Sequence, residues 1–355
     1  MRIVFITNGL SAGGSERVLS VIANELAARQ YEVSIVCVRG ITSFYPIDAH
    51  IRLIFLDKER HCGSLWEKML WIRKWVKRDP PDIIITFIVR VYGFTLLSLA
   101  GCHIPVITSE RNDPRSFPFL SQVIMRLFLP LSSHHVVQTA DIKAYYPSFI
   151  RKKTTVIANP VSPGIFSLPS VEKKDVVVCV GRLVAQKNHR MLINSFAAIA
   201  DRHPSYQLVI YGEGPLRERL MRQVRALGME DRIFLPGRTK DLFSRLREAR
   251  IFCLSSLYEG MSNALIEAMC LRLPVITTRV SGVDELIRNE ENGLVIPVND
   301  EVSYSEALDR LMGDKSFQTF LGENHRHHTS LFNINTITML WEHIIQETRE
   351  RHYRS

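Results

Sequence analysis

The sequence lacks paired cysteines. Its six cysteines are scattered, and no two form a Cys-x-x-Cys pair or another spacing typical of a zinc site. Several lie inside apolar, strand-like runs, so we expect reduced thiols in the core and a cytosolic compartment instead of a disulfide framework. The cysteines are Cys37, Cys62, Cys102, Cys179, Cys253 and Cys270.

Targeting signals and long uninterrupted apolar runs are also missing. Residues 1–10 begin directly with a buried-strand pattern and show no signal-peptide architecture. The longest apolar stretch, residues 83–106, is interrupted by Arg90, Gly93 and His103, which argues against a transmembrane helix. We therefore expect any contact with a membrane to be peripheral.

Motifs for a metal ion or a dinucleotide are absent as well. There is no Asp-x-Asp motif, and we expect neither a metal nor an organic cofactor. His325, His327 and His328 cluster without Cys or carboxylate companions, so a solvated face is favoured over a metal site. The Gly212-x-Gly214 pair lacks the third glycine of a dinucleotide fingerprint, which argues against NAD binding.

Positive charge is plentiful, and it is unevenly placed. The 355 residues carry a formal net charge of +9 and are numerous enough for two domains. Residues 1–163 hold 20 Lys and Arg against 12 Asp and Glu, whereas the remainder holds 25 against 24. The first half therefore needs an anionic partner, and nucleic acid, anionic lipid and a phosphorylated substrate all satisfy the charge alone.

Short apolar strands alternate with helical patterns along the whole chain, which indicates parallel sheets covered on both faces. A turn-rich break at residues 159–164 separates two such series. We therefore predict an α/β protein with two doubly wound, Rossmann-like domains, at 1–163 and 164–334, and a ligand cleft between them. A final helix over residues 335–355 is expected to return to the first domain. The predicted strands are 3–6, 33–38, 51–56, 82–87, 106–108, 135–137, 175–180, 207–211, 233–235, 251–254, 274–277 and 293–296.

Residues 181–189 form a basic loop between a predicted strand and a predicted helix. Backbone N–H groups and the dipole at a helix amino terminus attract anions. Arg182 and Lys187 add two cations at this rim, as a departing diphosphate requires. The alternative is an ordinary solvated loop, with Arg and Lys facing water.

The segment 258–268 places two carboxylates around a helix start. Glu259 precedes the predicted helix, and Glu267 lies in its second turn. Carboxylates accept hydrogen bonds from paired sugar hydroxyls, and the intervening backbone N–H groups can face a phosphate. A capping glutamate and a surface glutamate are the alternative. The residues between the carboxylates that we assign to donor binding are Gly260, Met261, Ser262, Asn263 and Ala264.

A third feature is the double glycine Gly13-Gly14, predicted as a loop after the first strand and before a helix from residue 16. Adjacent glycines permit close approach of the backbone to a donor phosphate or to an acceptor. Many strand–helix turns carry such a pair, so this signal alone is weak.

Together these segments resemble the signatures of retaining glycosyltransferase family 4, which has the GT-B fold. The Glu-(seven residues)-Glu spacing of Glu259 and Glu267 matches the family pattern, and the likeness covers nearly the whole chain. The resemblance implies that Arg182 and Lys187, with Gly181, hold the diphosphate of a uridine-linked sugar. It also implies that Glu259 binds the hexose and Glu267 the ribose, and that the loop at Gly237 and Arg238 meets the base.

One loop departs from the family pattern. Relatives often carry a histidine after the strand at 106–108, where this chain has Glu110 and Arg111. Arginine does not act as a base but binds phosphates well. We therefore assign Arg111 to the donor or an acceptor phosphate, and Glu110 to proton acceptance.

The acceptor side is expected in the basic first domain. Residues 65–78 interleave aromatic and basic side chains, which suits an anionic membrane surface, and residues 121–131 are a second candidate. Two ordinary core-facing helices are the alternative. The residues assigned to the membrane or acceptor are Trp66, Trp71, Arg73, Lys74, Trp75, Lys77 and Arg78, with Lys68 on the same basic helix.

The function implied by the resemblance is retaining, metal-independent transfer of a hexose or N-acetylhexosamine. The expected acceptor is a polyprenyl-diphosphate-linked saccharide at the cytosolic face of the membrane, in the synthesis of bacterial surface glycans. No nucleic-acid motif supports the nucleic-acid alternative. A nucleotide-sugar epimerase of the GT-B fold remains the alternative enzyme.

Overall fold

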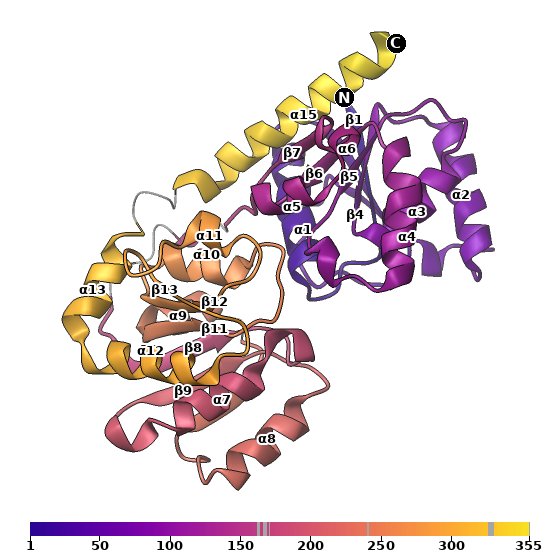
Figure 1. Cartoon of the computed structure of the whole chain (residues 1–355). Coiled ribbons are helices and arrows are strands. Elements are labelled where there is room, and N and C mark those ends of the chain that lie inside the picture. Colours follow the sequence, from indigo (N-terminus) through magenta and orange to yellow (C-terminus); the bar gives the residue numbers. More distant parts are fainter. Residues whose placement is uncertain (162–163, 166–168, 170, 240, 326–329, 355) are drawn as a thin grey trace. The chain divides into compact units, whose positions relative to one another are not determined.

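The computed structural model describes residues 1–161, 164–165, 169, 171–239, 241–325 and 330–354. Two compact units divide the chain, one formed by Met1–Pro160 with Asn333–Ser355 and the other by Val161–Phe332. Each unit is a doubly wound α/β structure with its own parallel sheet (Figure 1). The α/β class expected from alternating strands and helices is confirmed.

The sheet of unit 1 has seven strands among the described residues, in the order β3-β2-β1-β4-β5-β6-β7. All neighbouring pairs are parallel, so crossover connections join them, and these contain helices everywhere except between β2 and β3. The strands are β1 Arg2–Thr7, β2 Glu32–Cys37, β3 Arg52–Phe55, β4 Ile83–Phe87, β5 Val106–Ser109, β6 His134–Val137 and β7 Thr154–Val156.

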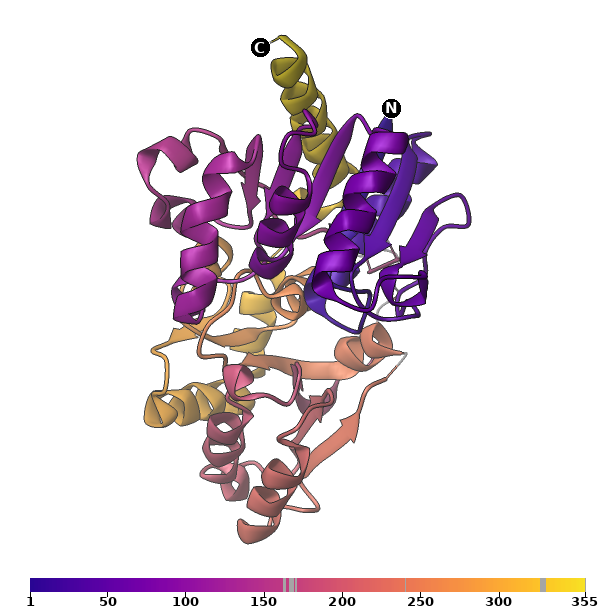
Figure 2. The same cartoon turned by 90° about the vertical axis from the view of Figure 1, so that its right-hand side faces the viewer.

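Alternate residues of these strands lie in two separate hydrophobic cores, one on each face of the sheet. Ile3 and Phe5 of β1 pack with helices α1 and α15 on one face, whereas Val4 and Ile6 pack with α2, α3 and α4 on the other. Figure 2 shows the sheet of unit 1 with helices in front of it. The helices are α1 Gly14–Ala28, α2 Leu65–Arg78, α3 Val89–Ser98, α4 Phe119–Phe128, α5 Ala140–Tyr145, α6 Ser148–Arg151 and α15 Ile334–Arg354, with 3₁₀ turns η1 Leu56–Lys58, η2 Pro114–Ser116 and η3 Leu129–Leu131.

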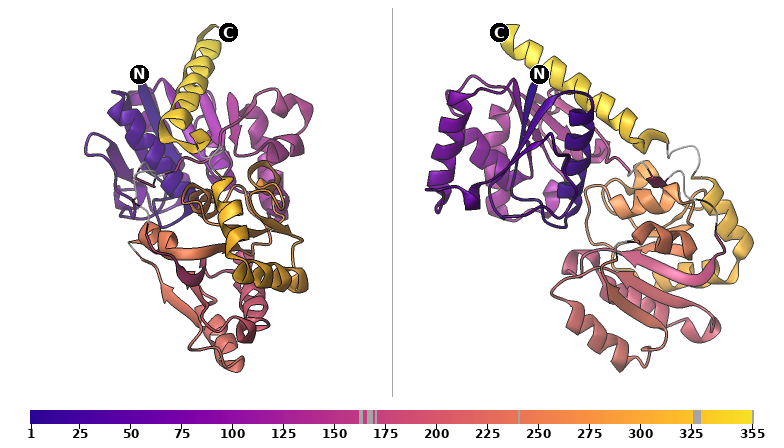
Figure 3. Two further views of the ribbon diagram at one scale, coloured as in Figure 1. Left: turned by 90° about the vertical axis from the view of Figure 1, so that its left-hand side faces the viewer. Right: turned by 180° about the vertical axis from the view of Figure 1, so that it is seen from behind.

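The C-terminal helix α15 belongs to unit 1, although it follows unit 2 in the chain. Ile337, Trp341, Ile344 and Ile345 are buried in the core beneath α1. Figure 3 shows this helix running along unit 1. Residues 333–355 therefore belong to the same compact unit as Met1–Pro160.

Unit 2 holds a six-stranded parallel sheet among its described residues, in the order β10-β9-β8-β11-β12-β13. Helices α7, α8 and α12 cover one face, and α9 and α10 lie against β8, β11 and β12. The strands are β8 Lys174–Val180, β9 Gln207–Tyr211, β10 Ile233–Gly237, β11 Ala249–Leu254, β12 Val275–Thr278 and β13 Leu294–Ile296. The helices are α7 His189–Ala197, α8 Arg217–Ala226, α9 Leu242–Glu248, α10 Asn263–Cys270, α11 Val283–Leu286, α12 Glu301–Gly313 and α13 Lys315–Glu323, with 3₁₀ turns η5 Ala185–Lys187, η6 Ala200–Arg202 and η7 Ser330–Phe332.

Several predicted boundaries are corrected. The double glycine is not wholly a loop, because α1 begins at Gly14 and extended Gly13 is its N-cap, with its carbonyl accepting from Arg17 N. The helix predicted after the basic loop begins at His189 and ends at Ala197, and a 3₁₀ turn follows. The segment 121–131 is a helix only to Phe128, because Pro130 has no N–H to continue it.

The structure places the cysteines and gives the length and composition of each described helix. Cys37, Cys62, Cys179 and Cys253 are buried thiols, and all six cysteines are unpaired with one another. Among the described residues, no helix combines the length and apolar composition that a bilayer span requires.

Candidate active site

The two predicted signature segments leave the sheet of unit 2 at the same place. Strand order reverses between the neighbours β8 and β11. Ligands of doubly wound sheets bind outside the carboxyl ends of the strands at such a reversal. Residues 181–188 follow β8 and residues 255–262 follow β11, so both segments flank this point.

Hydrogen bonds join these two loops. Leu257 N donates to Gln186 O at 2.8 Å, and the Gln186 side-chain amide donates to Tyr258 O at 2.9 Å. Ser255 Oγ donates to Lys187 O at 2.8 Å. The backbone on either side of Lys187 is therefore held against the loop that carries Glu259.

Lys187 and Glu259 themselves form an ion pair between these loops. Lys187 Nζ donates to Glu259 Oε1, and both side chains are largely buried. Ser256 Oγ donates to the same oxygen at 2.6 Å, while the Ser256 carbonyl accepts from Thr278 Oγ1 at 2.6 Å. The carboxylate is therefore oriented by a cation and a hydroxyl. Such a group can accept hydrogen bonds from sugar hydroxyls with little reorganisation.

Arg182 lies on the same rim but faces solvent. Its carbonyl accepts a hydrogen bond from His189 Nε2 at 3.2 Å. Burial lowers the pKa of His189 to about 4, so the ring is neutral and its other nitrogen can accept from Cys179 Sγ at 3.6 Å. Burial raises the pKa of Cys179 to about 12, which keeps that donor a thiol. The basic loop therefore rests on a neutral, hydrogen-bonded imidazole.

Glycines let a second loop pack beneath the first. A Cβ on Gly212 would lie 1.9 Å from Gly181 O, and one on Gly214 would lie 2.4 Å from Leu183 O. The backbones bond at this contact, since Leu183 N donates to Glu213 O at 2.9 Å. The Gly-x-Gly pair therefore supports the basic loop by close backbone packing.

The segment after Glu259 starts helix α10, which follows Glu259 and contains Glu267. Ser262 is the N-cap, and its hydroxyl accepts from Leu265 N at 3.4 Å. Gly260, Met261 and Ser262 are buried, whereas Asn263 and Ala264 are half-buried at the amino end of the helix. Glu267 is buried within the same helix. Gly237 ends β10 with φ +88°, and exposed Arg238 follows it.

The predicted residues of unit 1 lie at the carboxyl ends of its strands. Gly13 and Gly14 follow β1, and Tyr45 Oη donates to Gly13 O at 3.0 Å. Glu110 directly follows β5 and is buried. Its Oε1 accepts from the backbone N–H groups of Arg111 at 2.8 Å and Asn112 at 3.2 Å.

Arg111 turns its guanidinium toward aromatic rings. It lies 4.8 Å from the centre of Phe87 and 5.6 Å from that of Trp341, and Nη1 donates to Asn159 Oδ1 at 3.0 Å. Among the described residues, no acceptor contacts Nε or Nη2, which are both buried. Burial lowers the pKa of Arg111 to about 9, so the group still carries its proton at neutral pH. These contacts tie the loop after β5 to helix α15.

Some residues of these sites were not predicted. Ser255, Ser256 and Gln186 form hydrogen bonds that orient the loops after β8 and β11, but single polar residues after a strand carry no specific pattern. Ile88 follows β4 with φ +74°, a backbone conformation that is strained for a β-branched residue. It lies beside the reversal of strand order between β1 and β4 of unit 1, where strain often marks a functional position.

The basic helix α2 is partly structural. Trp66, Lys74, Lys77 and Arg78 are exposed, whereas Trp71 and Trp75 are half-buried, stacked on each other and packed on the core. Arg73 Nη1 donates to Ser98 O at 3.2 Å and to Ala100 O at 2.5 Å. Lys68 is not on a basic outer face, because it is buried and pairs with Asp57.

The histidine cluster also differs from expectation. His325 is buried and its Nε2 contacts Leu273 O at 3.0 Å, so it is not part of a solvated face. His327 and His328 lie outside the described residues. Among the residues that the structure describes, no three His, Cys, Asp or Glu side chains are grouped to hold a metal ion.

Comparisons with known proteins agree with this architecture. The model for "Glycosyltransferase Family 4" matches residues 12–164, and that for "Glycosyl transferases group 1" matches residues 164–328. A Campylobacter jejuni α-1,4-N-acetyl-D-galactosaminyltransferase named for a diphospho-undecaprenol-linked saccharide is 28% identical over 360 residues. The match covers 98% of this chain and 99% of that protein. A second C. jejuni N-acetylgalactosaminyltransferase is 26% identical, over 86% and 88% of the two chains.

Solved structures show the same fold at lower identity. Sucrose-phosphate synthase from Thermosynechococcus elongatus superposes with a TM-score of 0.83 at 21% identity, over 100% of both chains. Anabaena HepE in complex with UDP gives a TM-score of 0.79 at 17% identity, over 98% of this chain and 100% of that one. The chain is thus an enzyme of the family 4 glycosyltransferases, with the two Rossmann-like domains of the GT-B fold.

Proposed function

We propose that this enzyme transfers a hexose or N-acetylhexosamine from a uridine-linked nucleotide sugar to a polyprenyl-diphosphate-linked saccharide. The two C. jejuni relatives, which are named for acceptors of that class, support the acceptor. The transfer would contribute to bacterial surface glycans at the cytosolic face of the membrane. The domain assigned to the donor is unit 2, and the domain assigned to the acceptor is unit 1.

The observation that carries the proposal is the Lys187–Glu259–Ser256 contact at the strand-order reversal of unit 2. Lys187 and Arg182 would bind the donor diphosphate, so that Lys187 exchanges its bond to Glu259 for a phosphate oxygen. Glu259 would then accept hydrogen bonds from the hexose, and Glu267 would do so from the ribose. Backbone N–H groups at the start of α10 add donors for the phosphate.

The proposed reaction is a substitution with retention and needs no metal ion. The bond between the sugar C1 and the diphosphate oxygen breaks as the bond from the acceptor hydroxyl to C1 forms on the same face. The hydroxyl proton passes to the leaving diphosphate, and Lys187 and Arg182 stabilise the charge that develops there. On the acceptor side, Arg111 is proposed to contact a phosphate. Glu110 is proposed as the alternative acceptor of the hydroxyl proton, in place of the diphosphate.

The distribution of charge supports an anionic acceptor. Unit 1, including α15, holds 23 Lys and Arg against 15 Asp and Glu, whereas unit 2 holds 22 against 21. A lipid-linked diphosphate and the anionic surface of a membrane would both meet this excess. The proposal includes peripheral association with that surface.

The test is a screen of nucleotide sugars with a short-chain polyprenyl-diphosphate saccharide, followed by mass spectrometry. The proposal predicts an acceptor heavier by one hexose or N-acetylhexosamine, and release of nucleotide only when acceptor is present. Conversion of the nucleotide sugar to an isomer without any acceptor would instead support the epimerase.

A further inference from the structure

Helix α4 of unit 1 carries apolar side chains on its outer face as well as on its inner face. Seven of its ten residues are apolar, in the sequence FLSQVIMRLF. Ile124 and Phe128 lie against Gly93 of α3, and Met125 is buried. A helix on the surface of a soluble domain ordinarily carries polar residues on its outer face. The outer face of α4 instead carries mainly apolar residues.

The outward side chains are large and very exposed. Phe119 is 80% exposed, Leu120 69% and Leu127 63%. With 100° of rotation per residue, these three side chains lie within about one-third of the helix circumference. Leu131 in η3 and Phe149 in α6 are also exposed, by 65% and 58%. We call these five residues the α4–α6 surface. Exposed apolar residues concentrated in this way indicate an interaction site for a protein, a membrane or a ligand.

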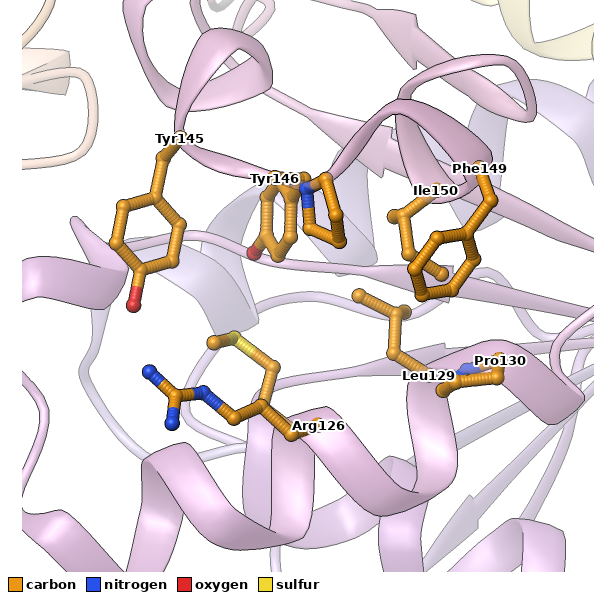
Figure 4. A pocket seen from close by; sticks show the side chains of 9 residues that line it. Arg126, Leu129, Pro130, Tyr145, Tyr146, Phe149 and Ile150 are labelled. Carbon is orange, nitrogen blue, oxygen red and sulfur yellow. The ribbon is translucent and has the colours of Figure 1, made fainter.

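A pocket opens between α4 with η3 and α5 with α6. Its volume is about 240 Å³, and Met125, Leu129, Tyr146 and Ile150 supply buried apolar walls. Figure 4 shows Phe149 facing Leu129 and Pro130 at one end. The Arg126 guanidinium and the Tyr145 hydroxyl lie at the other end. The pocket is therefore apolar along its length, with a cation at one side.

The charges around the pocket are nearly all positive. Residues 119–153 contain five Lys and Arg and one acid, Asp141. Arg115 holds that acid through two contacts, of 2.8 Å and 3.0 Å. Arg126, Arg151 and Lys152 are exposed. Apolar residues among cations without a competing acid match the interface of an anionic bilayer, where acyl chains lie beneath phosphates.

We propose that the α4–α6 surface docks on an anionic bilayer, with the pocket taking an apolar chain and Arg126 contacting the phosphate of that lipid. This inference rests on the proposed function, because it names the part of unit 1 that would bring the enzyme to a membrane-bound acceptor. It assigns the contact to α4 over α2, whose two half-buried tryptophans pack on the protein core. A protein partner or a second copy would cover the apolar residues but would not account for the cations.

Vesicle sedimentation of the full chain tests the docking surface. We expect binding to phosphatidylglycerol vesicles and little binding to phosphatidylcholine vesicles. Phe119→Ser with Leu127→Ser should weaken the binding about tenfold or more, as should Arg126→Glu. Val302→Ser in α12 removes a side chain that is 70% exposed in unit 2, and it should bind as the wild type does. Trp66→Ser in α2 tests the other candidate surface.

The docking surface is contradicted if the double serine variant binds vesicles like the wild type, or if only Trp66→Ser loses binding. Ultracentrifugation of the same proteins without lipid tests the alternative that a second copy of the chain occupies the α4–α6 surface. A dimer that the double variant disrupts, with vesicle binding unchanged, would assign the surface to a second copy and overturn the inference.

The pocket is tested with short-chain phosphatidylglycerol below its micelle concentration. Calorimetry should show saturable binding that Phe149→Ala and Arg126→Glu weaken, while inorganic phosphate binds far less. Equal binding of inorganic phosphate would overturn the role of the apolar walls. Turnover of a water-soluble acceptor by the wild type is measured separately. An enzyme that turns over this acceptor but ignores vesicles contradicts only the docking, whereas one that binds vesicles without transfer contradicts only the proposed function.

Discussion

At the scale of single residues, the chemistry proposed for unit 2 depends on the ion pair of Lys187 and Glu259. The pair is largely buried, and Ser256 donates to the same carboxylate. Breaking a buried ion pair leaves an uncompensated charge. If Lys187 turns to a donor phosphate, Ser256 and the sugar hydroxyls would therefore have to stabilise the Glu259 carboxylate through hydrogen bonds.

Removing either member of this pair should slow transfer strongly. Lys187→Ala and Glu259→Gln are expected to lower kcat/KM by about 10²–10³-fold, the usual effect of removing a group that stabilises developing charge. Lys174→Ala is the matched control, because Lys174 pairs with Glu248 at 2.7 Å on the surface of the same unit. If Lys174→Ala lost as much activity as Lys187→Ala, the loss would come from the change in net charge of unit 2 and not from the proposed site.

His189 makes the stability of unit 2 depend on pH. Burial lowers its pKa to about 4, below the unfolded value of 6.5, so the unfolded chain binds more protons between these values. Stability should therefore be full above pH 6.5 and fall as the pH drops toward 4, by about 3 kcal/mol at most from this residue. Urea unfolding of the wild type and of His189→Gln at pH 7 and pH 4.5 measures this change in the free energy of unfolding. The variant should lose less stability on acidification, and an equal loss would contradict this assignment.

Of the four charged residues that the sequence assigned to the donor, Lys187 and Glu259 lie in contact, because each follows one of two neighbouring strands. The roles given to these two residues, Arg182 and Glu267 stay predictions. Ser256 and Ile88 were not predicted, because a hydroxyl that orients a carboxylate and a strained backbone depend on tertiary contacts. Lys68 was placed on an outer face because a basic helix does not reveal that one of its lysines is buried against Asp57.

At the scale of elements, close backbone packing holds the basic loop. Gly214→Ala would place a Cβ 2.4 Å from Leu183 O. We expect it to destabilise unit 2 by about 1–3 kcal/mol, as overpacking does, and to weaken donor binding. Gly313→Ala in α12 meets only an ordinary contact at 3.7 Å and serves as control. Thermal unfolding compares the two, and an unchanged Tm for Gly214→Ala would show that the loops separate freely.

The second element is α15, which unit 1 needs for its core. Trp341 is fully buried, stacks on Phe87 at 6.0 Å and lies beside Arg111. Trp341→Ala should lower the free energy of unfolding of unit 1 by about 3–5 kcal/mol. Met339→Ala, at an exposed position of the same helix, should change it little. Denaturation followed by circular dichroism tests this, and equal effects of the two substitutions would contradict a core role for α15.

Most strands could be predicted because buried parallel strands are continuous apolar runs. Strand β7, Thr154–Val156, was missed because three residues between charged and polar neighbours form no such run. The start of α1 was placed two residues late, since glycine disfavours a helix interior but is tolerated at its first position.

At the scale of the whole molecule, the two units differ in net charge although both have the same kind of architecture. The surplus of about eight charges that the sequence shows in residues 1–163 stays with unit 1, since α15 adds as many acids as bases. Alternation of strands and helices was enough to predict two doubly wound domains. The sugar, the acceptor and the linkage follow from side-chain contacts with ligands, which no periodicity encodes.

The central claim is that the joined loops of unit 2 bind the donor, with Lys187 on the diphosphate and Glu259 on the sugar. Calorimetric titration of UDP and of a UDP-sugar into wild type, Lys187→Ala, Glu259→Gln and Lys174→Ala tests it most directly. We predict that Lys187→Ala weakens both ligands by about tenfold or more, that Glu259→Gln weakens mainly the UDP-sugar, and that Lys174→Ala changes neither. Unchanged affinity of Lys187→Ala for UDP and of Glu259→Gln for the UDP-sugar would contradict the claim.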